Sequence, residues 1–336
     1  MSQEAAARDA PAEEAVLHKS SKKRIIVSLS IISVAAIGLG LGAGFFLHNQ
    51  IAGGTLTDYN NVNADDYVDD NTNLLNDYAK VKKAGGHYLV AYEKEPYKVA
   101  NIAYGLYSKE THLFAQGIGS GTAKMLGMAI VQQIRSTVIR DNDNYFEESC
   151  SCSKVVNLAD RMYQSGDSVV RNEGKVKDAN AEIPENFTKA TPYSLPDYRK
   201  AMGRLLSDPC IYLISSKTTY LDETATSGAK TSFSETNGGY ALELELDPVH
   251  SVINYVRQMQ TISSLVSPPA FTYVHLSLSL DKDLNLLSME THEYYYAAVS
   301  TAAGSYVEGR LRTVYQSGGN YTIPELNDPV SYREKM

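Results

Sequence analysis

Two stretches near the C-terminal end decide the fold: residues 240–246 read YALELEL, and residues 271–281 read FTYVHLSLSLD. Apolar and polar residues alternate in both, which is typical of β-strands with one buried face and one solvated face. Two further long strands are expected over residues 286–299 and 306–316. Because the last three strands follow one another after short turns, this part of the chain predicts an antiparallel meander.

One helix is expected between the two alternating stretches. Asp247 is a residue type that caps helices, and Pro248 suits the first helical position. Val252, Val256 and Met259 then recur at helical spacing. An apolar helix stripe beside an apolar strand face predicts a layered α+β arrangement.

The elements expected upstream are mixed. Helices are predicted over residues 71–83, 96–108 and 197–206, and strands over residues 111–117, 131–140, 145–153 and 210–215, with a short strand around Val169. The polar residues of VQQIRSTVIR and YFEESCSCS recur on one face, which indicates a half-solvated sheet. The segment GIGSGTAK (117–124) lacks the spacing of a nucleotide-binding loop and is interpreted as a flexible turn between strands. The fold class predicted is α+β, with a curved antiparallel sheet and helices packed on one side.

Two sets of side chains are candidates for binding. Residues on the inward strand faces and the helix stripe either form a filled core or hold an apolar ligand, and they are Leu242, Leu244, Leu246, Val252, Val256, Met259, Val274, Leu276 and Leu278. Three consecutive rings, Tyr294, Tyr295 and Tyr296, are candidates for an exposed surface that binds a partner.

The N-terminal part predicts a membrane anchor. Residues 25–47 are 23 consecutive residues without a charge, and a helix of that length spans about 34 Å, enough for a hydrocarbon core of about 30 Å. The run is longer than the apolar part of a signal peptide and does not end in small residues. The predicted organisation is a disordered tail (1–24), a transmembrane helix (25–47), an acidic flexible tether (48–70) and one folded domain (71–336).

Charge around the span sets its orientation. Lys19, Lys22, Lys23 and Arg24 precede it, while the following flank to Asp66 holds no Lys or Arg. The positive-inside rule therefore predicts a single-pass protein of the cell membrane with a cytoplasmic N-terminus and an extracytoplasmic domain. Within the span, Gly38 and Gly42 have the spacing of a close helix–helix contact, so a dimer through them is one interpretation, and common membrane glycine is the other.

The charge composition of the chain limits the classes of partner that it can bind. The chain has 39 acidic and 31 basic side chains, and the basic ones cluster only before the predicted span. An acidic domain argues against nucleic acid, because phosphate binding requires clustered Lys and Arg. We therefore expect the membrane, an apolar ligand or a protein as partner.

No catalytic or metal-binding pattern is found, so we expect a protein that is not an enzyme and takes no cofactor and no metal. The seven histidines never pair at metal-ligand spacing, and His292, beside Glu290 and Glu293, fits a solvated strand position better than a catalytic one. Cys210 pairs with Cys150 or with Cys152 in a disulfide, or all three cysteines are small apolar residues; spacing leaves these alternatives open.

The order of elements and the Tyr-rich strands, including residues 271–281 and the phrases QQI (132–134) and YFEE (145–148), resemble the bacterial lipoprotein-carrier superfamily. The resemblance covers roughly residues 85–316 and implies a half-barrel sheet closed by helices around an apolar cavity. A membrane helix in place of a lipidated cysteine or cleaved signal departs from the family and argues against a freely shuttling carrier. We therefore expect a tethered binding protein for a lipid or other apolar ligand; the alternative is a cell-surface protein- or wall-interaction module with a packed core.

Overall fold

A computed structural model describes residue 56 and residues 58–125, 128–153, 157–175, 191–221, 231–262, 265, 267–300, 303–319, 321 and 323. The predicted tail, the predicted transmembrane helix with Gly38 and Gly42, and most of residues 48–57 lie outside this part. Within the described ranges, no helix is long and apolar enough to cross a membrane.

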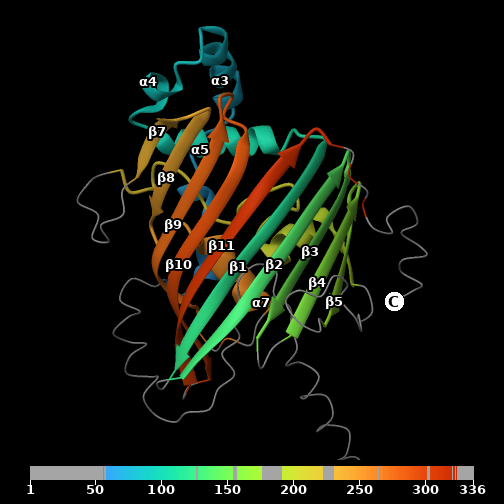
Figure 1. Ribbon diagram of the computed structural model, residues 1–336. Helices are drawn as coiled ribbons and strands as arrows, with labels where there is room; N and C mark the ends of the chain where they lie inside the picture. Colours follow the sequence, from blue (N-terminus) through green and yellow to red (C-terminus); the bar gives the residue numbers. More distant parts are fainter. Residues whose placement is uncertain are drawn as a thin grey trace, which may run out of the picture.

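The core of the fold is a curved, unclosed sheet of eleven antiparallel strands (Figure 1). The first six are β1 (His112–Met125), β2 (Met128–Asp141), β3 (Asn144–Cys152), β4 (Asn157–Ser165), β5 (Ser168–Gly174) and β6 (Thr191–Ser194). The other five are β7 (Ser232–Thr236), β8 (Gly239–Leu246), β9 (Ala270–Asp281), β10 (Leu286–Ser300) and β11 (Ala303–Ser317). Their order across the sheet is β6-β5-β4-β3-β2-β1-β11-β10-β9-β8-β7, so the β1–β11 pair joins the two halves at the centre.

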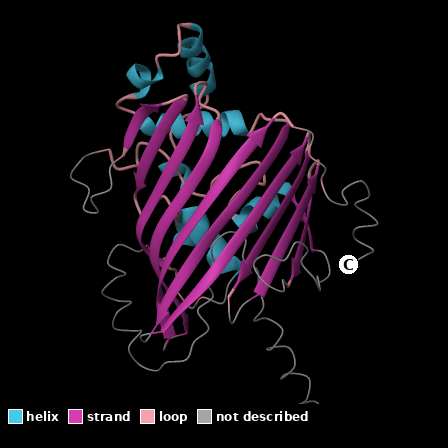
Figure 2. Cartoon of the chain, viewed as in Figure 1, coloured by secondary structure: helices cyan, strands magenta, loops and turns pink. Residues whose placement is uncertain are grey.

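The helices lie inside the curve of the sheet or at its end (Figure 2). They are α3 (Leu74–Lys83), α4 (Tyr88–Tyr92), α5 (Pro96–Tyr107), α6 (Leu195–Met202) and α7 (Ile253–Ile262), with short 3-10 turns η3 (Tyr59–Asn61) and η4 (Ala64–Tyr67). Pro96 occupies the first turn of α5, as predicted. The α+β class and the curved antiparallel sheet are therefore confirmed.

The alternating stretches behave as expected. In β9, Val274, Leu276 and Leu278 are buried, whereas His275, Ser277 and Ser279 lie on the opposite, more accessible face. β8 continues the same apolar face, because Leu244 pairs with Leu276 across the ladder. The period of two in the sequence thus sets which face of this half of the sheet is buried.

Three predicted elements are wrong. Residues 117–124 form no turn but lie inside β1, where a side chain on Gly117 would come within 2.3 Å of Ser136 Oγ and one on Gly119 within 2.2 Å of a β11 carbonyl oxygen. These glycines permit a close approach between strands instead of a reversal. Residues 210–215 form no strand, because the Leu213 N–H donates to the Ser251 carbonyl rather than to a ladder.

That same hydrogen bond explains the third error, the start of α7. The helix begins at Ile253 and not beside Pro248, since Ser251 O accepts from Leu213 at 2.8 Å and is not free for a helical bond. Asp247 instead caps a turn, accepting from the backbone N–H of Val249 at 2.9 Å. The strands β4, β6 and β7 and the helix α4 were not predicted at all.

Residues 58–70 are folded, so the prediction of a flexible tether over residues 48–70 is wrong for this part. Tyr59 is 1% exposed, and Arg257 of α7 donates to its carbonyl oxygen at 2.9 Å. Asp69 accepts from Ser216 N and Ser216 Oγ, both at 2.7 Å. The acidic residues that indicated a solvated linker therefore serve partly as acceptors for the domain.

Residues 321 and 323 cover part of the convex face. Tyr321 and Ile323 pack with the row formed by Phe114, Ile139, Phe146 and Tyr163 on four adjacent strands. This cover explains the burial of Phe146, and β3 as a whole is buried along nearly its whole length. The prediction that YFEESCSCS is half-solvated is therefore wrong.

We expect Tyr59→Ala to lower the free energy of unfolding by about 3–5 kcal/mol, because it removes a fully buried aromatic ring from the core. Tyr220→Ala is the matched control, since Tyr220 is 41% exposed and its loss should cost about 1 kcal/mol or less. Urea unfolding of the full chain measures both. Equal costs would mean that residues 58–70 are detached from the domain in solution.

Candidate binding cavity beneath the central strands

The nine apolar candidates lie in the packed core. All are buried within one hydrophobic cluster between β8, β9, α5 and α7: Leu242, Leu244, Leu246, Val252, Val256, Met259, Val274, Leu276 and Leu278. None of them lines the cavity described below. Whether any contacts a ligand stays a prediction.

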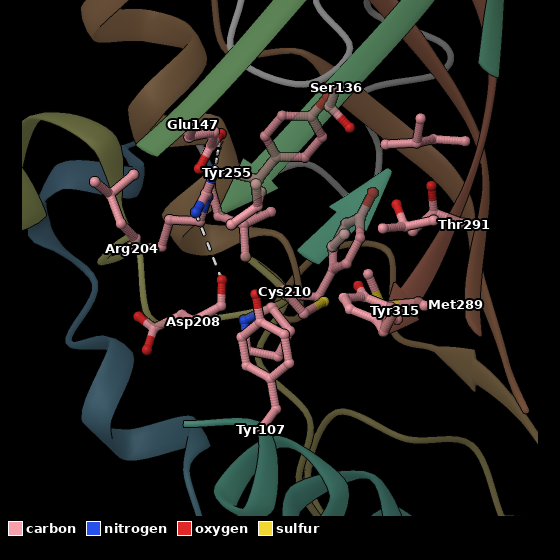
Figure 3. A pocket seen from close by; sticks show the side chains of 18 of the residues that line it. Tyr107, Ser136, Glu147, Arg204, Asp208, Cys210, Tyr255, Met289, Thr291 and Tyr315 are labelled. Atoms are coloured by element: carbon pink, nitrogen blue, oxygen red, sulfur yellow. Dashed lines mark hydrogen bonds and ion pairs between the residues drawn. The ribbon is translucent and has the colours of Figure 1, made fainter. Parts of the chain in front are cut away.

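A cavity lies next to this core, beneath the central strands (Figure 3). One wall comes from five adjacent strands and includes Glu147 of β3, Ser136 of β2, Ala115 of β1, Thr313 of β11 and Thr291 of β10. The opposite wall comes from residues 204, 206 and 208–212, with rings from α5 and α7. Its volume is about 60 Å³, room for a few water molecules or a short chain.

Small residues at the centre of the sheet create this space. Gly117, Ser136 and Thr313 lie side by side on three paired strands, so no large side chain projects from the wall here. The covering segment runs from Gly203 to residue 221 and contains no helix and no strand in the described chain. Irregular cover over small side chains leaves a gap that a helix with long apolar residues would fill.

Four tyrosine rings line the cavity together with aliphatic side chains. Tyr107 meets Tyr315 edge to face at 5.4 Å between ring centroids, and Tyr212 meets Tyr255 likewise at 5.8 Å. Burial raises the pKa of all four phenols, so each keeps its proton and remains a donor. Burial also raises the pKa of the Cys210 thiol to about 11, so it is present as an unreactive thiol.

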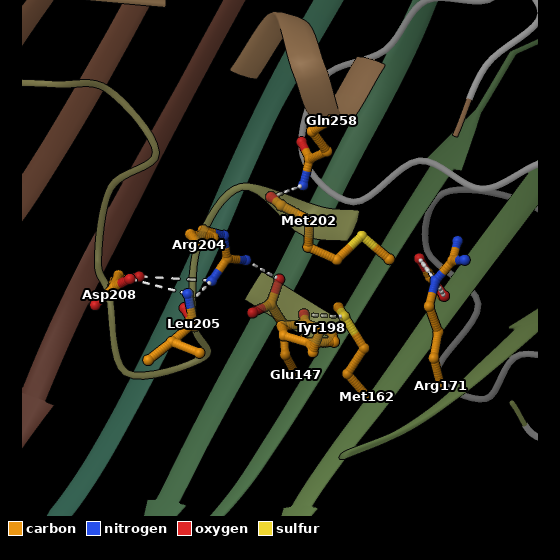
Figure 4. Close-up of polar contacts among 10 residues, drawn as sticks. Glu147, Met162, Arg171, Tyr198, Met202, Arg204, Leu205, Asp208 and Gln258 are labelled. Atoms are coloured by element: carbon orange, nitrogen blue, oxygen red, sulfur yellow. Dashed lines mark hydrogen bonds and ion pairs between the residues drawn. The ribbon is translucent and has the colours of Figure 1, made fainter. Parts of the chain in front are cut away.

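One buried ion pair closes the β3 end of the cavity (Figure 4). Arg204 Nη2 donates to Glu147 Oε1, and Nη1 donates to the carbonyl oxygens of Leu205 at 3.1 Å and Asp208 at 3.5 Å. Burial alone would lower the pKa of Arg204, but the Glu147 carboxylate beside it raises the pKa above its ordinary value. The guanidinium is therefore charged, and both of its terminal nitrogens donate to partners.

Two polar atoms in the cavity wall have no hydrogen-bond partner in the structure. They are Glu147 Oε2 and Thr291 Oγ1, on side chains at most 6% exposed. Buried polar atoms are nearly always satisfied by protein or by ordered solvent. These two atoms thus mark positions where the cavity can hold a polar group.

A second buried carboxyl lies behind the tyrosine wall. Glu293 of β10 is fully buried, accepts from Tyr212 Oη, and also accepts from Tyr255 Oη at 3.4 Å. Burial raises the pKa of Glu293 to about 8, although both phenols act in the opposite direction. It is therefore mostly protonated at neutral pH.

The sequence interpretation required Tyr294, Tyr295 and Tyr296 to be exposed together. In the structure only Tyr294 is exposed. Tyr294 is 38% exposed, but Tyr295 is buried on the opposite face of β10 and Tyr296 is buried against Tyr306. Successive residues of a strand point to opposite faces, so three adjacent rings cannot form one surface.

The carboxylate that bonds His292 is Glu308, with Oε1 at 3.2 Å, and not Glu290 or Glu293. Among the residues that the structure describes, no group of three or more His, Cys, Asp or Glu can hold a metal ion. Cys150, Cys152 and Cys210 form no disulfide with one another in the described chain. Cys150 and Cys152 share the convex face of β3 with Glu148, whereas Cys210 lines the cavity on the concave side.

The residues that build the cavity were missed by sequence reasoning. Glu147 looked like a solvated strand residue, and Arg204 lay in a segment expected to be helical. One signal was present: Tyr145 and Phe146 are adjacent apolar residues in β3, which indicates burial on both faces. That signal makes Glu147 a buried charge in need of a partner.

The chain is similar to known proteins only in its structure, and only weakly. No protein-family model matches the chain, and no curated protein does. Several solved structures are similar to it, and two of them are described next. A putative outer membrane lipoprotein-sorting protein domain from Vibrio parahaemolyticus is 10% identical, with 71% of this chain and 98% of that chain covered and a TM-score of 0.26. A DUF1329 family protein from Desulfovibrio piger is 7% identical, with 68% and 94% covered and a TM-score of 0.24.

The first of these is the kind of protein that the sequence resemblance named. At a TM-score of 0.26 the likeness is weak, and it carries no argument about fold or ligand. The geometry of the cavity is therefore the basis for inferring a function.

We expect the free energy of unfolding to fall between about pH 5 and 8 because of Glu293. In that window the folded protein holds a proton that the unfolded chain, with an ordinary pKa of 4.5, has released. Rising pH therefore favours unfolding, by at most about 1.4 kcal/mol per pH unit. Glu293→Gln should remove this part of the slope in denaturant unfolding at several pH values.

Glu290→Gln is the matched control, because Glu290 lies on the same strand with its side chain on the opposite face. Other groups that titrate in the window, such as Asp160 with its pKa raised by burial to about 7, remain in both variants. A Glu293→Gln profile parallel to that of the wild type would contradict an uncharged Glu293.

Proposed function

We propose that this chain is a binding protein that holds an apolar ligand in the cavity beneath β1, β2 and β11. The observation that carries the proposal is a space at the centre of the concave face, lined by tyrosine rings and small side chains and covered by irregular chain. Ligand sites are concave and mostly apolar, with a few placed polar groups, and this cavity has that composition.

The volume limits what can bind without rearrangement. About 60 Å³ accepts a short chain or the end of a longer one, and a whole lipid requires residues 203–221 to move. The proposal includes the predicted setting, in which residues 25–47 hold the domain outside the cell membrane. Tethering favours local capture or presentation of a ligand over free transport.

A second candidate is a surface-interaction module. The convex face of the central strands carries exposed Ile118, Val131 and Tyr306 beside Tyr294. Such scattered apolar side chains suit a protein partner, but they also occur on ordinary surfaces. An absence of ligand in the cavity would favour this second candidate.

The test is solvent extraction of the purified full-length protein, followed by mass spectrometry. We expect a stoichiometric apolar molecule from the wild type and none from Ala115→Leu, because the larger side chain fills the cavity from β1. Ala129→Leu is the matched control, since Ala129 is exposed on β2 and its enlargement leaves the cavity unchanged.

Thermal unfolding of each variant confirms that it is folded. Clean extracts from all three proteins, with native masses equal to that of the polypeptide, would contradict the proposal and favour the interaction module. An equal yield from wild type and Ala115→Leu would place the ligand elsewhere.

A further inference from the structure

The charges lining the cavity decide what kind of polar group fits it. Among the described lining residues, Arg204 is the single cation, while Glu147 and Asp208 are acidic. Arg204 is already paired with Glu147 and with two backbone carbonyl oxygens. An anionic head group would therefore enter a wall with no free positive charge, at a large desolvation cost.

The unsatisfied atom at this end is an acceptor. Ionised Glu147 can only accept hydrogen bonds, and Oε1 is occupied by Arg204 while Oε2 has no partner. A ligand atom that donates a proton satisfies Oε2. A second cation is disfavoured there, because the Arg204 guanidinium shares the same carboxylate.

Thr291 Oγ1 cannot serve the same ligand group. Thr291 lies on β10 and Glu147 on β3, four strand spacings apart, which is roughly 19 Å along the sheet. The Glu147 end is thus a separate polar position at the edge of a mostly apolar space.

We infer that the ligand carries a neutral hydroxyl group that donates to Glu147 Oε2, so that the cavity selects apolar alcohols over carboxylates and over isomers that lack a donor. This inference rests on the proposed function and adds the chemical class of the ligand. A site built to hydrogen-bond a hydroxyl rejects analogues without one, because its buried acceptor is then left unpaired.

The test uses three small probes with the full-length protein: pentan-1-ol, its isomer butyl methyl ether, and pentanoate. Saturation-transfer NMR titrations give their relative affinities. We expect the wild type to bind pentan-1-ol about tenfold more tightly than either competitor. In Glu147→Gln the amide oxygen can face Arg204 and the NH₂ group the cavity, so pentanoate should bind more tightly than pentan-1-ol.

Glu148→Gln is the matched control, because the neighbouring Glu148 points to the convex face and pairs with Arg161 at 2.6 Å. It should leave the wild-type ranking unchanged. Because Glu147→Gln strands a buried guanidinium and can fail to fold, a double variant, Glu147→Leu with Arg204→Met, supplies an apolar replacement of the pair. In it, pentan-1-ol should lose its advantage over the ether.

The outcomes separate the two proposals. Binding of all three probes with equal affinity, or tighter binding of pentanoate, by the wild type would overturn the hydroxyl inference while leaving an apolar ligand site in place. Binding of none of them by the wild type would overturn both. A pentan-1-ol preference that survives in the double variant would also overturn the assignment to Glu147.

Discussion

The antiparallel pairing of β1 with β11 is the contact on which the rest of the structure depends. It joins the strands of residues 112–194 to those of residues 232–317, and without it the sheet would be two separate meanders. Glycines at 117 and 119 make the pairing and the neighbouring β1–β2 contact sterically possible. Because these glycines have no side chains, the wall is flat at this place. The residues that allow the two halves of the sheet to pair therefore also leave the space beneath it.

The two halves bury different chemistry. Beneath β8 and β9 the inward residues are mainly leucine and valine, and they pack against the helices. Beneath β3 to β5 the inward residues include Glu147, Asp160 and Arg171, which are buried and paired: Arg171 Nε lies 3.1 Å from both Asp160 oxygens. Buried ion pairs contribute little net stability, because desolvation offsets the attraction. These ion pairs fix the position of the chain instead. The pair between Arg204 and Glu147 holds one end of residues 204–212 against the sheet.

Sequence alone predicted the half of the fold in which local pattern and burial agree. In β9 and in α7 one face is buried and the other is more accessible. Such an arrangement produces a regular apolar and polar pattern, so the alternation in β9 and the helical spacing at Val256 and Met259 could be recognised in the sequence. It failed for β3, where Tyr321 and Ile323 cover the outer face, and for Gly117, where the need for glycine comes from a strand far away along the chain. The cavity residues Glu147 and Arg204 are 57 positions apart and meet only through tertiary packing, so no local pattern could reveal them.

The cover over the cavity is a long connection with no helix and no strand in the described chain. Long irregular connections inside a compact domain are uncommon and usually functional. Residues 203–221 are held to the domain by polar contacts along their whole length, including Arg204 to β3, Asn101 to the Ile214 carbonyl oxygen at 3.0 Å, the Leu213 N–H to the Ser251 carbonyl oxygen at 2.8 Å, and Ser216 to Asp69. The segment begins at Gly203, whose φ of +70° and contact with the Asn254 carbonyl oxygen exclude any larger residue. The Arg204–Glu147 pair is one of these contacts, so the residue proposed to recognise the ligand's polar end also helps to hold the cover in place.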